Sequence, residues 1–369
     1  MSDKETISGR QLTLLTFTFI IATGTLFVPS MVAKKAGQDG WLSVLIAGIV
    51  GVILVFIITA LGLRFPEKSL VEYSEIILGK WLGKIIVLIY ILFYFHLSSN
   101  IIRGVTSTIQ GTLLQNSTLE TITIIVFLAS AYSVKMGLET ITRANILNLF
   151  VTFLAIFTVF ILLIKDMNIE MLTPVLSRGI VPVLRGSVEP ASWFCQVVSI
   201  AFIMPFINKP KETRLCAIIG VVWAAVTLSI MAALVVVIFG PQLASVLSFP
   251  TLEVVRYINV GQYIQRVEIV FLIPWIISNY IKICFFYYIT VLIVSKIFKI
   301  EKTKTLVIPV GLVLFSMSIA LFKNNVELSS FFSQVSGYYF LPVELGIPAL
   351  LLVIELIRKK GRRKSEQKV

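Results

Sequence analysis

Residues 19–41 read FIIATGTLFVPSMVAKKAGQDGW, a stretch that begins like a membrane helix and then weakens. Its middle is the small polar run ATGT at 22–25, and Pro29 follows one turn later. Glycine and proline both weaken the interior of a helix, and lipid cannot satisfy the backbone groups of a broken one. Two interpretations are therefore open. Either the helix is broken and its freed amides bind a ligand, or the small residues form a packing face with a mild kink.

The composition of the chain indicates an integral membrane protein. Of its 369 residues, 57% are hydrophobic and 14% are charged, and the mean hydropathy is +0.95. A soluble domain of this length has too little interior for so much apolar surface. The first apolar stretch has no clear signal-peptide cleavage site, so we expect it to be retained as a membrane span.

Residues that usually carry catalysis or bind metals are sparse. Cys195, Cys216 and Cys284 lie in separate apolar runs without a CxxC pair, which excludes a disulfide framework and a zinc-ligand pattern. His96 is the single histidine, and the sequence contains no GxxxxGK[ST], GxSxG, HExxH or GxGxxG motif. We therefore expect no enzyme activity, no metal and no cofactor.

Apolar runs of about 20 residues, the length that crosses a bilayer, occur ten times. They predict spans near 11–33, 41–63, 84–108, 120–137, 144–165, 190–208, 213–239, 264–296, 304–322 and 335–357. The ten spans predict one all-α transmembrane domain over residues 1–369, followed within it by a basic cytoplasmic tail at 358–369.

The distribution of positive charge predicts the orientation of these spans. With both termini in the cytoplasm, the inside segments carry 22 lysines and arginines and the outside loops carry 8. This bias satisfies the positive-inside rule, so the net charge of +13 is mainly a topology signal and a contact with anionic lipid headgroups. Nucleic-acid binding by the tail sequence RKKGRRKSEQK is the less common alternative, and we expect no nucleic-acid partner.

Two loops contain short amphipathic segments. In the run 65–84, Ser69 and Glu72 form a capping box that begins a helix, and Gly79 ends it. The charge pattern of this helix places it along the cytoplasmic surface. Residues 240–262, which include PTLEVVRYINVGQ, predict a second segment over the extracellular mouth.

Span six is interrupted at a position that corresponds to the interruption of span one. The run ASWFCQVVSIAFIMPF at 191–206 places small and polar residues ahead of Pro205. Interrupted helices at corresponding positions in two halves point to a transporter fold built from an inverted repeat. We therefore predict a 5+5 inverted repeat with interrupted helices 1 and 6, in which repeat one covers about 11–165 and repeat two about 190–357.

One face of span three carries polar side chains at helical spacing: His96, Ser99, Asn100, Arg103, Thr106, Ser107 and Gln110. This stripe is expected to face the protein interior, because a charge such as Arg103 is costly in lipid. His96 lies near mid-depth, where it is either a hydrogen-bonded interior residue or a proton carrier.

Spans eight and ten add further buried charges. Lys282 lies near mid-depth in span eight, and Glu344 lies between two prolines in span ten. Arg103 and Glu344 have compatible depths for an outer gate. Lys282 is placed to offer its ammonium to carbonyls freed in span one, in the position of a bound cation. Purely structural ion pairs are the alternative for all three residues.

The sequence resembles a known family from about residue 7 to 357. The similar runs are ISGRQLTLLTFTFIIATGTLFVPSMVAKKAGQDGWLS, SLVEYSEIILGKWLGK, GLETITR, PTLEVVRYINVGQYIQRVE and WIISNYIKICFFYY. They resemble the B subunits of GerA-type spore germinant receptors, and the elements at 38–41 and 266–268 carry most of the specificity. That family belongs with amino acid–polyamine–organocation transporters and is similar to the leucine-transporter fold.

The resemblance implies a multi-pass protein of the bacterial spore inner membrane that assembles with a larger A subunit and a lipoprotein C subunit. It would bind a nutrient, an amino acid or a sugar, in a mid-membrane pocket between helices 1, 3, 6 and 8. The implied ligand-binding positions are Thr23, Gly24, Thr25, Asn100, Arg103, Gln196, Val198, Ser199 and Ala201. Lys282, Glu344 and His96 are expected to gate this pocket or to replace a cation.

In this hypothesis the amides near Gly24 hold the nutrient carboxylate, and carbonyls of span six hold its amine. Three other functions remain open: a proton-coupled amino-acid transporter with the same pocket, an ion channel opened by nutrient, and a structural subunit without a ligand. Movement of labelled solute by the chain alone would distinguish the transporter from the receptor subunit.

Overall fold

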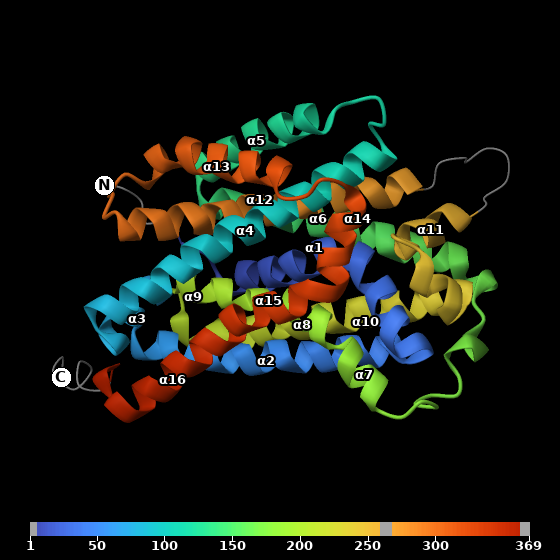
Figure 1. Cartoon of the computed structure of the whole chain (residues 1–369), viewed down its shortest axis with the longest axis horizontal. Helices are drawn as coiled ribbons and strands as arrows, with labels where there is room; N and C mark the ends of the chain where they lie inside the picture. The colour runs from blue at the N-terminus through green and yellow to red at the C-terminus, as the bar shows by residue number, and fades with distance from the viewer. Residues whose placement is uncertain (1–5, 259–267, 362–369) are drawn as a thin grey trace.

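The computed structural model describes residues 6–258 and 268–361, and within them the regular secondary structure is helical apart from one isolated backbone bridge. Ten segments have the length of a membrane crossing. They are α1 (Gly9–Ala36), α2 (Gly40–Arg64), α4 (Lys80–Thr112), α5 (Leu119–Met136), α6 (Leu138–Leu163), span six (188–206), α10 (Thr213–Val246), α12 (Glu268–Ile297), η7 (Thr303–Leu306) together with α13 (Val307–Ala320), and span ten (325–358). The short helices α3 (Leu70–Leu78) and α11 (Pro250–Tyr257) lie toward opposite ends of the bundle, here called the α3 end and the α11 end (Figure 1).

Nine stretches of the described chain are long and apolar enough to cross a membrane. The first, Gly9–Arg64, has 56 residues. At 1.5 Å per residue these make about 84 Å of helix, against about 30 Å for the hydrocarbon core. The chain turns at η1 (Gly37–Asp39), where Gly37 has φ +61, a conformation that glycine adopts without strain. This stretch therefore gives two crossings, and the described chain contains the ten that the sequence predicts.

Helix α1 occupies the middle of the bundle (Figure 1). It packs along α10 and also contacts α12, α6 and α2. Every residue from Leu15 to Pro29 is buried. A helix enclosed in this way cannot leave its polar groups to water or lipid, so they need partners within the protein.

Glycines allow close contact between α2 and its neighbours. A Cβ added at Gly48 would lie 2.6 Å from Cβ of Ala225 on α10, and one at Gly51 would lie 2.8 Å from Cβ of Phe194 in span six. No side chain fits at such distances, so these two contacts require glycine.

The structure confirms the predicted helix at the α3 end. The backbone N–H of Ser69 donates to Glu72 Oε2 at 3.0 Å in a capping box, and the helix stops at Gly79, which has φ +93. Helix α11 confirms the described part of the second predicted segment. Residues 259–262 of that segment, residues 266 and 267 of the family motif and residues 362–369 of the tail lie outside the described chain.

Span ten is irregular along its length. It consists of α14 (Asn325–Ser330), η8 (Phe331–Val335), α15 (Ser336–Leu341), η9 (Pro342–Gly346) and α16 (Ile347–Arg358). Both η8 and η9 are π-helical. π-Helical turns are rare, and they occur frequently at functional sites.

Candidate functional site

The structure corrects the predicted break in span one. Helix α1 is one uninterrupted α-helix through Thr23-Gly24-Thr25. Pro29 has no N–H for the carbonyl of Thr25, and the Thr251 hydroxyl of α11 donates to that carbonyl at 2.6 Å. The helix keeps its geometry because a side chain supplies the hydrogen bond that proline removes.

A second carbonyl of α1 is held in the same way. Asn279 of α12 donates through Nδ2 to the Ala22 carbonyl oxygen at 3.0 Å, and the Thr25 hydroxyl donates to the same oxygen at 3.3 Å. The Ala22 and Thr25 carbonyls, which the predicted break would leave free for a cation or ligand, are therefore hydrogen-bonded within the protein.

Gly24 faces a neighbouring helix in the structure. A Cβ added there would lie 3.0 Å from Leu228 Cδ1, so the glycine packs against α10. Because the surrounding helix is intact, its amides do not form the predicted carboxylate cradle. At this position the small-residue packing interpretation is the correct one.

The predicted interruption of span six is confirmed. The span consists of α8 (Val188–Cys195), a 3-10 turn η4 (Gln196–Ser199), α9 (Ile200–Ile203) and a second 3-10 turn η5 (Met204–Phe206). Pro205 lies in the second turn, where it removes a backbone donor.

Both ends of span six are tied to the ends of span one. At the α3 end, the Ile7 amide donates to the Phe206 carbonyl at 2.8 Å, and the Asn208 amide donates to the Ile7 carbonyl at 3.1 Å. At the α11 end, Lys35 forms an ion pair with Glu189, which is buried. The two spans are therefore connected at both ends.

The hydroxyl of Thr23 joins α1, span six and α12. It accepts a hydrogen bond from Trp193 Nε1 at 2.8 Å and another from Lys282 Nζ at 2.8 Å. Lys282 is fully buried, and its ammonium also lies 5.9 Å from the ring centroid of Phe286. The sequence correctly predicts that Lys282 reaches the middle of span one. The acceptor of its hydrogen bond, however, is the Thr23 hydroxyl and not a backbone carbonyl.

Glu344 supplies a carboxylate to the same region from η9 of span ten. It is fully buried and interacts electrostatically with Lys282. Neither of its oxygens has a hydrogen-bond partner within the described residues. An ammonium has three donors, and Thr23 accepts one of those of Lys282. Thr23, Trp193, Lys282 and Glu344 are here called the polar centre.

The predicted outer gate between Arg103 and Glu344 is wrong. Arg103 donates through Nη2 to the Phe322 carbonyl oxygen at 3.0 Å, and its electrostatic partner is Glu120 at the start of α5. Arg103 and Glu344 have suitable depths along their helices, but depth does not determine which way a helix is rotated. Arg103 therefore holds the loop after α13 and does not belong to the polar centre.

The span-six residues singled out from the sequence are all buried. Ser199 Oγ lies 2.9 Å from Tyr94 Oη, which links span six to α4. Gln196 Oε1 is buried and has no hydrogen-bond partner within the described residues. Val198 and Ala201 are packed in the apolar core without any exposed surface.

His96 and Asn100 form a separate pair on α4. Asn100 Nδ2 lies 3.2 Å from His96 Nδ1. The imidazole is half-buried, with its ring centroid 5.6 Å from that of Phe331 and 5.0 Å from that of Tyr339. His96 thus contacts span ten rather than the polar centre.

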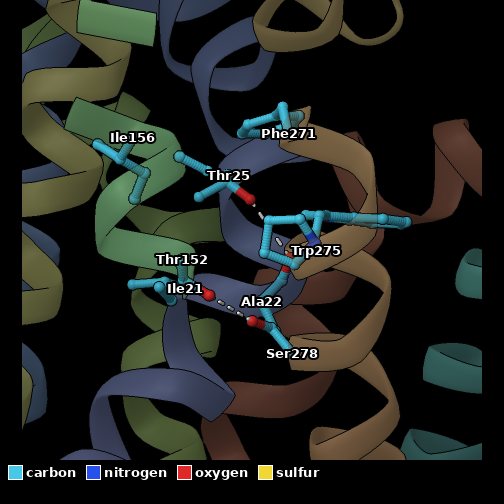
Figure 2. Close-up of a pocket in the computed structure, with 10 residues that line it drawn as sticks. Ile21, Ala22, Thr25, Thr152, Ile156, Phe271, Trp275 and Ser278 are labelled. Atoms are coloured by element: carbon cyan, nitrogen blue, oxygen red, sulfur yellow. Dashed lines mark hydrogen bonds between the residues drawn. The ribbon is translucent and has the colours of Figure 1, made fainter. Parts of the chain in front are cut away.

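A small cavity lies on another face of α1 (Figure 2). It measures about 20 Å³ and is lined by residues of α1, α6 and α12. Thr25 and Trp275 lie at its edge, and the hydroxyls of Thr152 and Ser278 lie 3.5 Å apart on its wall (Figure 2). This volume holds about one water molecule, so the cavity has no room for a nutrient.

Sequence reasoning missed two donors to α1. Trp193 is one of them, and its signal was its position three residues before Gln196 and six before Ser199, which places all three on one face of span six. Thr251 is the other, and its signal was Pro29, which requires a replacement donor for the carbonyl four residues earlier.

Solved structures with a similar fold define the class of the protein. MhsT, solved in complex with L-phenylalanine, matches with a TM-score of 0.67 over 96% of this chain and 99% of its own, at 13% identity. Mhp1, a nucleobase-cation-symport-1 family transporter solved in a closed conformation with bromovinylhydantoin bound, matches with a TM-score of 0.69 over 95% of this chain and 78% of its own, at 15% identity. The chain therefore has the leucine-transporter-like fold of membrane transporters, as predicted.

The chain belongs to the spore germination protein family, whose model matches residues 6–326. Spore germination protein KB of Bacillus subtilis is 26% identical over 99% of this chain and 98% of its own length. Spore germination protein YndE of the same organism is 29% identical over 97% of this chain and 98% of its own. The chain is therefore a multi-pass membrane protein of spore germination with a transporter-like fold, and these matches are not to enzymes.

Proposed function

We propose that this chain is the nutrient-binding subunit of a spore germination receptor, with the ligand bound at the polar centre between helices 1, 3, 6 and 8 and span ten. The observation that carries the proposal is the pair Lys282 and Glu344, both fully buried and both with unused hydrogen-bonding capacity. A zwitterionic amino acid offers the complementary charges, a carboxylate for Lys282 and an ammonium for Glu344. Burial of charged groups is costly unless they are paired and hydrogen-bonded, so such a ligand satisfies both.

A neutral sugar would use different groups of the same region. The hydroxyls of Thr23 and Ser199 and the unpartnered amide oxygen of Gln196 are buried within it. These groups form hydrogen bonds without requiring a charge on the ligand. The charges of Lys282 and Glu344 favour an amino acid over a sugar.

The structure suggests how binding at this site becomes a signal. A ligand carboxylate competes with Thr23 for the Lys282 ammonium, and so weakens the contact between α1 and α12. A ligand shifts a conformational equilibrium only when it binds one state more tightly. The contacts that tie span one to span six at both ends then transmit the displacement.

We also propose that the receptor contains a larger A subunit and a lipoprotein C subunit in the spore inner membrane. The support is membership of the spore germination family together with the sequence resemblance described above. Affinity purification of the tagged chain from spore membranes is expected to recover both subunits in constant ratio.

Direct binding tests the ligand site. Radiolabelled L-amino acids and sugars are equilibrated with the purified full-length chain and with Glu344→Gln, and Glu355→Gln serves as the control. Glu355 is also a buried glutamate of span ten, but its Oε1 accepts from the Gly361 amide. We expect Glu344→Gln to weaken binding of an amino acid by about tenfold or more, roughly 1.4 kcal/mol, and Glu355→Gln to bind like wild type. Equal affinity of wild type and Glu344→Gln, or no binding by wild type, would contradict the proposed site.

A proton-coupled amino-acid transporter is the second candidate function, because a buried ammonium and carboxylate can exchange a proton as a solute passes. The chain alone, reconstituted in liposomes with an acidic exterior, would then accumulate labelled amino acid. Binding without uptake supports the receptor subunit, and uptake that depends on Glu344 supports the transporter.

A further inference from the structure

A larger cavity opens at the α11 end of the bundle, away from the polar centre. Its volume is about 280 Å³, and it lies between α1, α4, the loop before α11 and the first part of span ten. Asn325 and Val326 at its rim are exposed, so it is accessible from that end. Its volume is close to the lower limit of known ligand sites, about 300 Å³.

An aromatic layer separates this cavity from the polar centre. The ring of Phe27 contacts those of Phe249 and Phe332, with centroids 5.5 and 5.2 Å away. The indole of Trp193 lies below, 5.7 Å from Phe332, and it is the same indole that donates to Thr23. The cavity is therefore a compartment of its own above the proposed nutrient site.

Most of the residues that line the cavity are polar, and the one charged residue among them is a lysine. Among the fourteen described residues that line it are six hydroxyl side chains, two amides and Lys34, but no aspartate or glutamate. Such a lining attracts an anion and offers donors and acceptors to its polar substituents.

Ser107 of α4 contributes an unsatisfied hydroxyl to the wall of the cavity. Its side chain is 5% exposed, and its hydroxyl has no hydrogen-bond partner within the described residues. Gly104, one turn earlier on the same face, has no neighbour closer than 3.9 Å to an added Cβ. An unpartnered buried hydroxyl is unfavourable. A polar group in the cavity would supply the missing hydrogen bond of Ser107.

We propose that this cavity is a second ligand site, which binds a small carboxylate that also bears hydroxyl or amide groups. Lys34 pairs with the carboxylate at the rim, and Ser107 hydrogen-bonds to a polar substituent inside. This site is distinct from the polar centre, and the proposal does not depend on the function proposed above.

Protection of a cysteine from labelling tests the site in the full chain. Ser107→Cys in purified protein is treated with a small charged maleimide in the presence of D-gluconate or its neutral counterpart D-glucose, and the labelled peptide is quantified. The unsubstituted chain, with its native cysteines, gives the background. We expect millimolar D-gluconate to slow labelling of residue 107 by about threefold or more, and D-glucose to slow it less.

Two lysine variants distinguish the effect of the Lys34 charge in the cavity from the general effect of removing a positive charge. Lys34→Gln in the Ser107→Cys chain is expected to abolish the difference between the two sugars. Lys323→Gln is expected to leave it intact, because Lys323 is an exposed lysine that does not line the cavity. Labelling unaffected by D-gluconate, or slowed equally by D-glucose with and without Lys34, would overturn the proposal.

A thermal-shift measurement serves if Ser107→Cys does not fold. D-gluconate is expected to raise the melting temperature of wild type and of Gly111→Leu, but not of Gly104→Leu, whose side chain fills the cavity. Gly111 is also on α4, and an added Cβ there meets nothing within 4 Å. An equal shift in both variants would also overturn the proposal. Loss of binding at the polar centre would leave these results unchanged, because Lys282 and Glu344 do not line the cavity.

Discussion

Thr23 is the residue at which α1 is bonded to span six and α12. Its oxygen accepts from Trp193 and from Lys282, so both of its lone pairs are used and its own proton remains to be donated. A ligand carboxylate that competes with Thr23 for the Lys282 ammonium, as proposed above, can also accept this proton. If the proposal is correct, we expect ligand specificity at this site to depend on the Thr23 hydroxyl, the Lys282 ammonium and the Glu344 carboxylate.

The charge pair at the polar centre is expected to show strong energetic coupling. Lys282→Met leaves the carboxylate of Glu344 buried without the cation with which it interacts electrostatically. Loss of one partner from a buried pair in direct contact costs about 3–5 kcal/mol, which is the upper limit expected here. Lys282→Met should therefore lower the melting temperature, and the double variant Lys282→Met, Glu344→Gln should recover part of the loss. A double variant whose destabilisation equals the sum of the two single variants would show that the groups do not interact.

At the residue scale the sequence predicts which side chains matter better than it predicts their partners. The depth of Lys282 along span eight indicates correctly that it reaches the weak part of span one. The rotation of each helix is not set by depth, so the choice of Thr23 as acceptor and the separation of Arg103 from Glu344 depend on packing. The predicted carboxylate cradle at Gly24 is wrong for a related reason. A glycine indicates that another group approaches the backbone closely, but not whether that group belongs to a helix or to a ligand.

At the scale of the secondary-structure elements, α1 and span six differ in how they accommodate the backbone donor that a proline lacks. Each contains a proline that removes a backbone donor. Span six changes to a 3-10 turn at η5, which contains Pro205, and has another such turn at η4. Helix α1 stays helical because Thr251 and Asn279 bond its carbonyls. The sequence predicts both weak points from Pro29 and Pro205, but the donors that repair α1 come from distant segments and are not predictable from it.

The link between α1 and α11 is testable by a rescue. Thr251→Val leaves the buried Thr25 carbonyl without its donor, which costs about 1–3 kcal/mol. Pro29→Ala restores a backbone N–H for the same carbonyl, so Thr251→Val should cost much less in the Pro29→Ala background. Thermal unfolding of the four chains in one detergent measures this, and an undiminished cost would refute the proposed role of Thr251.

Helix α3 is attached to α12 through Glu72. Lys296 Nζ lies 3.3 Å from Glu72 Oε1. Burial alone raises the pKa of Glu72, but hydrogen bonds from Ser69 and the charge of Lys296 outweigh it, so the pKa lies below its ordinary value. The resulting stabilisation is present above the ordinary pKa and is lost as pH falls through the lowered one.

Glu72→Gln keeps a capping-box side chain but removes the charge. Its stability relative to wild type should be lowest at neutral pH, and the two should converge in acid. Melting temperatures of both chains, measured from neutral to acidic pH, give this difference in stability. A difference that is constant with pH would show that the charge of Glu72 contributes nothing.

At the scale of the whole molecule, the described residues make an even number of crossings, so the described beginning and end of the chain lie at the same end of the bundle. Ile7 is bonded there to the end of span six, and Arg358 and Lys360 donate to carbonyls of α3. The fold class and the ten crossings are predictable because hydropathy and charge are summed over long segments. The division into two repeats stays a prediction from the sequence.

The orientation in the membrane is the prediction at this scale. Positive charge is concentrated at the α3 end, which we expect to be cytoplasmic. A cysteine at Lys165, after α6, should react with an impermeant maleimide applied to intact cells, and one at Lys68, before α3, only after permeabilisation. The reverse pattern would place the α11 end in the cytoplasm.

The most direct test of the proposed nutrient site is germination of spores carrying Thr23→Val, with levels of the chain and of the proposed A and C subunits measured by immunoblot. Thr18→Val is the matched control, because Thr18 is also buried on α1 and its hydroxyl donates to Asn145 Oδ1 at 2.7 Å, outside the polar centre. We predict that Thr23→Val shifts or abolishes the dose response to nutrient at normal protein levels, while Thr18→Val responds like wild type. An unchanged response of Thr23→Val spores would contradict recognition of nutrient at the polar centre.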